Sequence, residues 1–304
     1  MALKIKKAEI EDIPKIMSLI NSCAVPYKSA DYLKWWHFSS LIPTVTFCAA
    51  YDEEFIGMFK IYKRKLVNNL NCGVLMGLAI KEKWRGKGLF KELGVKAMDY
   101  FEDLDLLCCF PNLNGKRALE KNFNFRTIDN IETMILTNNT NFNCQDYVCN
   151  PITPKIRFNN INIEKEDTFI FLADEDFRQW RFTLHPRYSY YMIRIDSNEF
   201  VITNIYYDKE KNIRYGDIVD FQASVLEENR LINLFNCACS ILKKDVDMVT
   251  IQAVPNSLLY EVVKKKGFVK SNIKHFFCIK IKEPHNEYLY NSSNWLIKWG
   301  DYLR

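Results

Sequence analysis

The first 136 residues alternate between segments of strand-like apolar patterning and segments of helical periodicity. Apolar positions alternate with polar ones, or run together over strand length, in residues 3–10, 44–50, 55–65, 72–80, 104–110 and 131–136. Apolar positions recur at helical spacing in residues 13–20, 30–38 and 89–101, and a further helix is expected after Pro111-Asn112. This order of elements predicts an α/β fold.

The connection between the strand at 72–80 and the helix at 89–101 is basic and contains two glycines. Residues 78–90 read LAIKEKWRGKGLF, so Arg85-Gly86-Lys87-Gly88 lies directly before the helix. Glycines let backbone N–H groups approach a ligand closely. A helix start adds N–H groups without intrahelical partners and the positive end of the helix dipole. The segment therefore predicts a phosphate site, with an ordinary surface turn as the structural alternative.

These residues resemble the pyrophosphate loop of the GNAT acyltransferase superfamily. The family motif places Arg or Gln three residues before a Gly, with Gly or Ala two residues later and an apolar strand residue five before the Arg. Arg85, Gly88 and Ile80 match this motif, whereas Phe90 stands where the family prefers Gly or Ala. A large side chain at this position either narrows the approach to the cofactor or faces the core.

The resemblance implies acetyl-CoA, or another acyl-CoA, as the cofactor. The backbone of residues 85–90 would hold the pyrophosphate, and the strand before it would pair with the pantetheine arm like an added strand. The order strand, loop, helix, strand, helix, strand also matches the GNAT core, in which two central parallel strands splay apart to admit the thioester. The cofactor-binding residues expected from the resemblance are Leu78, Ile80, Arg85, Gly86, Lys87, Gly88, Leu89 and Phe90.

Features of the first half recur in the second half in the same order. The segment 31–35 (DYLKW) recurs as 176–180 (DFRQW), and 110–112 (FPN) as 254–256 (VPN), at a period of about 145 residues. Matching both pairs in order indicates an internal duplication. With the family resemblance, it implies two tandem GNAT-like domains of the α/β (α+β) class, each a mixed, mostly antiparallel sheet with splayed central strands flanked by helices. The expected parts are an acyl-CoA-binding domain at 1–140, a linker at 141–155, a degenerate GNAT-like domain at 156–282 and an extension packing back at 283–304.

The second copy differs from the first where the cofactor would bind. Residues 218–242 contain no glycine, and Glu227 and Glu228 lie near the expected phosphate loop. A pyrophosphate would meet like charge there instead of backbone donors. Only the first domain is therefore expected to bind acyl-CoA, with the second shaping the acceptor site.

Composition narrows the class of protein only slightly. The net charge of +5 is spread along the chain and gives weak support to nucleic-acid binding, so no nucleic-acid partner is expected. None of the ten cysteines forms a C-x-x-C pair, so we expect free cysteines packed as small hydrophobes, no metal site and a reducing compartment. The N-terminus lacks a signal-peptide core, and no apolar run approaches the ~18 residues of a membrane-spanning helix. A cytoplasmic monomer or homodimer without membrane insertion is expected.

Acyl transfer to an amine requires a neutral amine, a stabilised oxyanion and protonation of the thiolate leaving group. Many GNAT enzymes use a carboxylate on the strand before the loop as base and a tyrosine in the later helix as acid. Residues 72–80 contain no carboxylate, Glu82 is expected to be a solvated turn charge, and Glu120 occupies the position of the tyrosine. Acid and base stay unassigned, and proximity with a backbone oxyanion donor is expected to carry most of the rate.

The remaining catalytic candidates are Asn112, His37 and His185. Asn112 follows the strand that flanks the thioester, and its structural alternative is an Asx turn or a helix N-cap. The alternative for each histidine is a structural or exposed role. Candidates for substrate contacts, with core packing as the alternative for the tryptophans, are Trp35, Trp36, Trp180 and Arg181.

The leading hypothesis is an acyl-CoA-dependent N-acetyltransferase that acts on a small amine. The tandem arrangement is similar to bacterial GNAT proteins that lie among surface-sugar genes, which implies an amino sugar or a nucleotide-linked amino sugar as the first acceptor to consider. A second class is a non-catalytic acyl-CoA-binding sensor. A third is an aminoacyl-tRNA-dependent transferase of the tandem type, which the loop at 85–88 disfavours because those enzymes generally lack it.

Overall fold

The computed structural model of the chain describes residues 3–23, 29–137, 142, 144, 147–158, 168–282 and 287–301. The chain forms two compact units. Unit 1 comprises Met1–Thr127, His185–Arg187 and Phe277–His285, and unit 2 comprises Ile128–Leu184, Tyr188–Phe276 and Asn286–Arg304.

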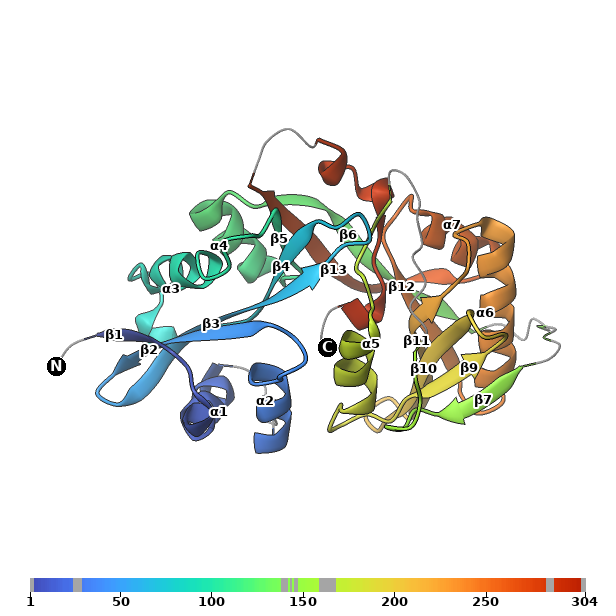
Figure 1. Cartoon of the computed structure of the whole chain (residues 1–304), viewed down its shortest axis with the longest axis horizontal. Helices are drawn as coiled ribbons and strands as arrows, with labels where there is room; N and C mark the ends of the chain where they lie inside the picture. The colour runs from blue at the N-terminus through green and yellow to red at the C-terminus, as the bar shows by residue number, and fades with distance from the viewer. Residues whose placement is uncertain are drawn as a thin grey trace. The chain divides into compact units, whose positions relative to one another are not determined.

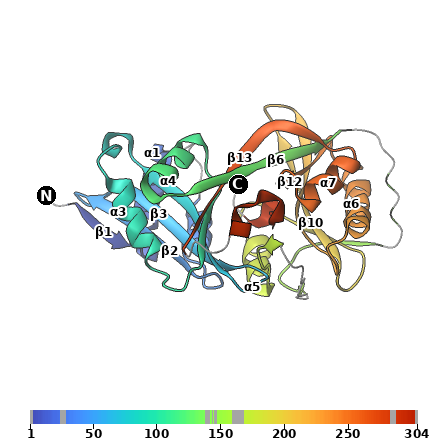
Figure 2. The ribbon, with the colours of Figure 1, turned by 90° about the horizontal axis from the view of Figure 1, so that it is seen from above.

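Unit 1 is a sheet of strands covered by helices on both faces. Neighbouring strands are antiparallel except β4 and β5, which are parallel. Helices α3 (Leu89–Met98) and α4 (Leu113–Phe123) lie on one face, and α1 (Ile13–Cys23) and α2 (Ala30–His37) on the other (Figures 1 and 2). The strands, in spatial order, are β1 (Lys4–Lys7), β2 (Thr44–Tyr51), β3 (Glu54–Lys65), β4 (Asn71–Ile80), β5 (Leu106–Cys109) and the end of β13 (Val269–Ile281).

Local sequence explains where these helices begin and which face they bury. Helix α2 begins after Ser29, whose hydroxyl accepts a hydrogen bond from the backbone N–H of Tyr32. Helix α3 buries Leu89, Leu93 and Ala97, which recur at helical spacing and pack toward the sheet. The apolar face expected for residues 89–101 is therefore present.

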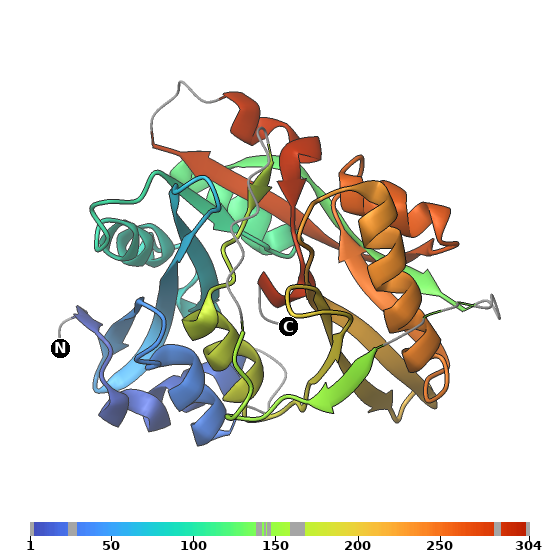
Figure 3. The same cartoon turned by 45° about the vertical axis from the view of Figure 1, so that its right-hand side comes forward.

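Unit 2 repeats this arrangement. Helices α6 (Glu228–Leu242) and α7 (Leu258–Lys265) lie on one face of its sheet, and α5 (Glu175–Arg178) with the π-helical turn Gln179–Thr183 on the other (Figure 3). Only β11 and β12 are parallel among the strand pairs described in this sheet. Its strands, in spatial order, are β6 (Arg126–Leu136), β12 (Met248–Ala253), β11 (Ile213–Gln222), β10 (Phe200–Asp208), β9 (Tyr191–Arg194) and β7 (Val148–Pro151).

Smaller elements complete the two units. A separate two-stranded sheet pairs β8 (Phe169–Ile170) in parallel with β14 (Trp295–Leu296). Short 3-10 turns occupy Ile10–Asp12, Glu82–Trp84, Glu287–Tyr290, Ser292–Asn294 and Trp299–Asp301. The two mixed, mostly antiparallel sheets with flanking helices confirm the fold class expected from the sequence. Among the described residues, no helix combines the length and apolar character needed to cross a membrane.

The units do not follow the boundaries expected from the sequence, because two strands leave their own half of the chain. Strand β6 follows α4, but its residues Glu132–Leu136 pair with β12 in unit 2. The end of β13 follows α7, but its residues Cys278–Ile281 pair with β5 in unit 1. Because these strands pair outside their own half of the chain, the first segment of unit 1 ends at Thr127, and a later segment, Phe277–His285, also belongs to unit 1.

The expected linker and C-terminal extension lie partly outside the described residues. Within the range expected as linker, β7 pairs with β9. The C-terminal segment packs into unit 2, where β14 pairs with β8 and both Trp295 and Trp299 are buried.

One expectation about the cysteines is wrong. Cys144 and Cys237 form a disulfide within unit 2, with their Cα atoms 4.8 Å apart. The two residues are separated by 93 positions. Sequence spacing did not predict this pair, since the two residues lie far apart in the chain and only the folded structure brings them together. The expectation of a reducing compartment rested on all ten cysteines being free, so the disulfide removes its support.

Candidate functional site

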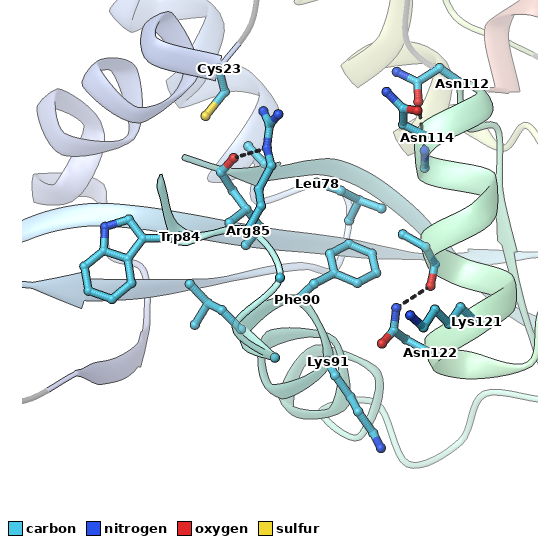
Figure 4. Close-up of a pocket in the computed structure, with 17 residues that line it drawn as sticks. Cys23, Leu78, Trp84, Arg85, Phe90, Lys91, Asn112, Asn114, Lys121 and Asn122 are labelled. Carbon is cyan, nitrogen blue, oxygen red and sulfur yellow. Dashed lines mark hydrogen bonds between the residues drawn. The ribbon is translucent and has the colours of Figure 1, made fainter. Parts of the chain in front are cut away.

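A cavity of ≈ 740 Å³ lies in unit 1 between the end of β4, the loop that follows it and helix α4 (Figure 4). Of the residues singled out in the sequence, Leu78, Ile80, Arg85, Gly86, Gly88, Leu89, Phe90 and Asn112 line it, and Lys87 does not. The other lining residues are Cys23, Ala79, Trp84, Lys91, Asn114, Gly115, Ala118, Lys121 and Asn122.

The cavity opens where β4 and β5 separate. The two parallel strands pair only over Cys72–Leu75 and Leu106–Cys109, and β4 continues to Ile80 without β5 beside it. A strand that loses its neighbour leaves backbone N–H and C=O groups available to another extended chain. The splay of two central parallel strands expected from the family resemblance is thus present in unit 1.

A β-bulge lies in β4 at the start of this splay. The register with β3 shifts so that Gly77 and Leu78 together face the single residue Phe59. Gly77 has a φ of +63°, which other residues adopt only with strain. The bulge re-aims the backbone of β4 at the point where the cavity reaches the strand.

The loop from Arg85 to Gly88 is shaped by its glycines and by one side-chain hydrogen bond. Arg85 Nε donates to the carbonyl oxygen of Ile80 at 3.1 Å, which ties the loop to the end of β4. Gly86 and Gly88 have φ values of +75° and +81°, and a Cβ atom at either would have no neighbour within 4 Å. Their conformation, together with open space at the N-terminus of α3, gives outward-facing N–H groups room for an anion.

The side chain of Phe90 points from α3 toward α4 (Figure 4). Its ring packs against Phe59 and Phe123, with centroids 5.6 and 5.5 Å away, and it also lines the cavity. Both sequence alternatives for Phe90 therefore hold in part: it joins the core and narrows the space between the two helices.

Helix α4 forms the opposite wall. Asn112 is its N-cap, with Oδ1 accepting a hydrogen bond from Gly115 N at 2.9 Å, so the expected structural role and a place in the cavity coincide. The sequence reading did not single out Asn114, Ala118, Lys121 and Asn122, which line the same wall. Their spacing along one helix after the second splayed strand is the signal that could have identified this face.

Neither titratable candidate near this wall points to acid catalysis. Glu120, at the position of the family's tyrosine, accepts a hydrogen bond from Thr127 Oγ1 at 2.7 Å and does not line the cavity. Cys109 donates to the carbonyl oxygen of Leu75 at 3.3 Å, where the two parallel strands stop pairing. Burial, reinforced by nearby Cys278, raises the pKa of the Cys109 thiol, which stays neutral.

The histidines and the α2 tryptophans lie apart from the cavity lining. His37 Nδ1 forms a hydrogen bond with Thr46 Oγ1 at 2.8 Å. His185 Nδ1 accepts from the backbone N–H of Arg187 at 3.1 Å, and its ring lies 4.4 Å from that of Trp35. Trp36 is buried beside them on α2, with its ring 5.8 Å from that of Tyr32.

Trp180 and Arg181 pack inside unit 2. Trp180 is 1 % exposed and contacts Phe177. Arg181 Nη1 donates to Tyr190 Oη at 2.8 Å, and Nε donates to the carbonyl oxygen of Gly300 at 3.3 Å. These internal contacts differ from the substrate contacts expected for both residues. For Arg181, the C-terminal segment supplies one of the partners.

The position in unit 2 that corresponds to the cavity is filled. Strands β11 and β12 pair only up to Ile218 and Ile251 and then separate, as β4 and β5 do. Beyond that point the remaining space is ≈ 0 Å³ and is bordered by Lys298 and Trp299 of the C-terminal segment. The ammonium of Lys298 forms an ion pair with Asp220, which also contacts Arg178 Nε at 3.4 Å.

Comparisons with known proteins agree with this geometry. Residues 11–125 match the model of the Acetyltransferase (GNAT) family. No curated protein matches the chain significantly in sequence. The fold is similar to that of a GCN5-related N-acetyltransferase from Anabaena variabilis, at 11 % identity and a TM-score of 0.66 over 92 % of this chain and 73 % of that one.

Two further structures resemble the chain in fold. A tandem GNAT protein from the clavulanic acid biosynthesis pathway has 11 % identity and a TM-score of 0.57, over 93 % of this chain and 99 % of its own. Eis1 from Mycobacterium abscessus has 10 % identity and a TM-score of 0.59, over 92 % of this chain and 73 % of its own. Residues 11–125 therefore match the Acetyltransferase (GNAT) family model, and the fold of the chain is similar to that of a tandem GNAT protein.

Proposed function

We propose that the protein transfers an acetyl group from acetyl-CoA to a small amine, with the cavity of unit 1 as its only cofactor site. The observation that carries this proposal is the continuity of three features: the splayed end of β4, the loop with two positive-φ glycines and the N-terminus of α3 all border one cavity of ≈ 740 Å³. A long extended ligand with a phosphate end fits this combination.

Specific residues are proposed to hold each part of the donor. Backbone N–H groups between Arg85 and Phe90 hold the pyrophosphate, and Lys87 adds positive charge from outside the cavity. The backbone of Leu78 and Ile80 pairs with the pantetheine arm where β4 has lost β5 as a neighbour. The open space around Gly86 and Gly88 supports this assignment, since a side chain there would occupy the space of the phosphates.

The donor supplies a thioester carbonyl: the amine nitrogen forms a C–N bond, the C–S bond breaks, and the amine loses a proton while the sulfur gains one. The chain's contribution is proposed to be positioning and stabilisation of the oxyanion by backbone N–H groups at the bulge of β4. Asn112, at the start of α4, lies at the cavity wall and is the side chain best placed to contact the reacting end. Roles for His37 and His185 are kept as proposals on the acceptor side, together with Trp35 and Trp36.

The acceptor is proposed to be an amino sugar, free or nucleotide-linked. The support is the similarity of the tandem arrangement to bacterial surface-sugar proteins, and one fold relative acts in the clavulanic acid pathway. Unit 2 is proposed to be a degenerate GNAT domain without its own cofactor. A cytoplasmic monomer or homodimer without a nucleic-acid partner completes the proposal.

A second candidate function is a non-catalytic acyl-CoA sensor, which one observation favours. Among the described residues that line the cavity, the titratable side chains are Cys23, Arg85, Lys91 and Lys121. None of them is a carboxylate, histidine or tyrosine, the usual groups for proton transfer in acyl transfer to an amine.

Calorimetric titration with acetyl-CoA tests the cofactor site. The wild type should bind one equivalent, and Gly88→Asp should weaken binding roughly 100-fold, because it places a carboxylate against the phosphates. Gly267→Asp is the matched control: Gly267 also has a positive φ of +87°, but it lies in unit 2 after α7. It should keep the wild-type affinity. A wild type that does not bind acetyl-CoA would sink the proposal.

Release of the CoA thiol distinguishes the two candidate functions. The wild type is incubated with acetyl-CoA and a panel of amino sugars, amino acids and aminoglycosides, and free thiol is measured. Amine-dependent release supports the transferase. Tight binding without release across the panel would favour the sensor.

A further inference from the structure

The side chain of Trp36 closes the far side of the sheet at the bulge in β4. A Cβ atom at Gly77 would lie 3.3 Å from Trp36 Cη2, so the outer edge of the indole stands directly against the bulged backbone. The cavity reaches β4 at Leu78, one residue away, and neither Gly77 nor Trp36 lines it. The indole is therefore a wall immediately beyond the end of the cavity.

This wall is held in place from several directions. Trp36 is 6 % exposed, and its backbone carbonyl accepts a hydrogen bond from the ammonium of Lys60. The same ammonium lies 4.7 Å from the centroid of the indole, and Tyr32 packs against the ring at 5.8 Å. Lys60 is itself fully buried. An aromatic ring with these contacts has little freedom to move aside for a ligand.

The direction of the proposed donor brings its acyl group to this wall. A pantetheine arm that runs along β4 from Ile80 to Leu78 next meets the point where β4 and β5 pair again, at Leu75 and Cys109. The arm cannot continue along the strand there, because backbone pairing closes the gap. The cavity also reaches Cys23 at the end of α1, on the same face of the sheet as α2. The acyl group therefore has a path through the splay toward the face on which α2 places Trp36.

We infer that Trp36 sets the length of the acyl group, so that the enzyme accepts acetyl or propionyl donors and excludes longer chains. The inference rests on the proposed function and names the donor class of the same site. A methylene without space in an apolar pocket costs about tenfold or more in selectivity. Trp35, the neighbour on α2, turns to His185 instead of to the bulge.

A series of acyl-CoA donors tests the inference by calorimetric affinity, which needs no acceptor. In the wild type, butyryl-CoA and hexanoyl-CoA should bind at least roughly tenfold more weakly than acetyl-CoA. Trp36→Ala should bring the hexanoyl affinity to within about threefold of the acetyl affinity, and Trp36→Phe should give an intermediate ratio. Trp295→Phe, a matched change of a buried tryptophan in unit 2, should keep the wild-type ratio.

The outcomes separate this inference from the proposed function. A wild type that binds acetyl-CoA and hexanoyl-CoA equally well would overturn the inference and leave the cofactor site intact. So would a Trp36→Phe variant that folds, binds acetyl-CoA and keeps the full wild-type selectivity. Failure of the wild type to bind any acyl-CoA would instead remove the proposed function. If Trp36→Ala does not fold, the conservative Trp36→Phe variant and the wild-type series still carry the test.

Discussion

The two units share their strand order, their splayed parallel strands and a Pro-Asn turn before the following helix, yet one has a cavity and the other does not. In unit 1 the space beyond the splay measures ≈ 740 Å³ and borders a loop with two positive-φ glycines. In unit 2 the space measures ≈ 0 Å³, and Lys298 and Trp299 border it. A duplicated fold therefore does not imply a duplicated site, because other side chains, two of them from the C-terminal segment, occupy the splay in unit 2.

The loops that follow the first of the two splayed strands also differ between the units. In unit 2 the buried carboxylate of Glu199 accepts hydrogen bonds from Ser224 N at 3.0 Å, Ser224 Oγ at 2.6 Å and Arg230 Nε at 2.6 Å. Ser224 lies in the connection between β11 and α6, the counterpart of the glycine loop. A loop N–H and an arginine thus hold an internal anion in unit 2, where unit 1 is proposed to hold a phosphate.

The largest effect is expected from removal of the Lys298 side chain. Asp220 is buried, which alone would raise its pKa, but Lys298 and Arg178 hold the pKa of Asp220 below its ordinary value of 3.8. Lys298→Ala removes one of these two cations, and breaking a buried ion pair costs about 3–5 kcal/mol. We expect a loss of this size in the free energy of unfolding by urea.

Lys298→Ala also tests whether packing by the C-terminal segment is enough to prevent a second cofactor site in unit 2. Lys282→Ala is the control, because Lys282 makes an exposed contact with the carbonyl oxygen of Glu102, and it should change stability little. Titration with acetyl-CoA should still give one site for Lys298→Ala, since the loop of unit 2 stays without glycines. A second binding equivalent would show that the C-terminal segment, and not the loop, is what excludes the cofactor.

A smaller effect is expected at Phe90, the residue that departs from the family motif. Phe90→Ala removes a half-buried ring from contact with Phe59 and Phe123 and should lower the free energy of unfolding by about 1–2 kcal/mol. It also widens the cavity between α3 and α4, so acetyl-CoA should bind roughly threefold more tightly. Weaker binding in a folded variant would mean that the ring supports the cofactor instead of narrowing its site.

The sequence predicted the elements of unit 1 and the position of its loop well, because these depend on local patterns. Residues 85–88 combine glycines, positive charge and a following helix, and each property can be read without the partner strands. The strand at 131–136 was also predicted, but its partner was not. Strand pairing is set by non-local contacts, and the exchange of β6 and β13 between the halves has no signature in either strand alone.

The residues that could not be identified from the sequence were missed for the same reason, because their roles depend on non-local contacts. Lys298 gave no signal in the sequence, because its meaning depends on Asp220, 78 positions earlier, being buried beside it. The disulfide between Cys144 and Cys237 was missed because its spacing fits no framework. By contrast, the absence of glycine and the presence of Glu227 and Glu228 in the loop of unit 2 can be read from composition alone, and the expectation that this loop binds no cofactor stays a prediction.

The smallest effect is expected from Glu199→Gln, and its pH dependence is the informative part. Burial alone would raise the pKa of Glu199, but Arg230 and Ser224 hold the pKa below its ordinary value of 4.5. A carboxyl with a lowered pKa in the folded state stabilises the fold above its unfolded pKa, and this stabilisation is lost as the pH falls through the folded pKa. The variant should lose about 1 kcal/mol at neutral pH, since Arg230 is partly exposed and screened.

The difference in unfolding free energy between wild type and Glu199→Gln should therefore shrink as the pH falls from about 7 to about 3.5. Denaturant unfolding at a series of pH values measures it. Glu227→Gln is the control, because Glu227 lies in the same loop but its side chain makes no capping hydrogen bond to α6. A deficit for Glu199→Gln that stayed constant across this range would show that the carboxylate's charge is not what the loop of unit 2 holds. The parallel between an internal anion in unit 2 and a bound phosphate in unit 1 would then fail.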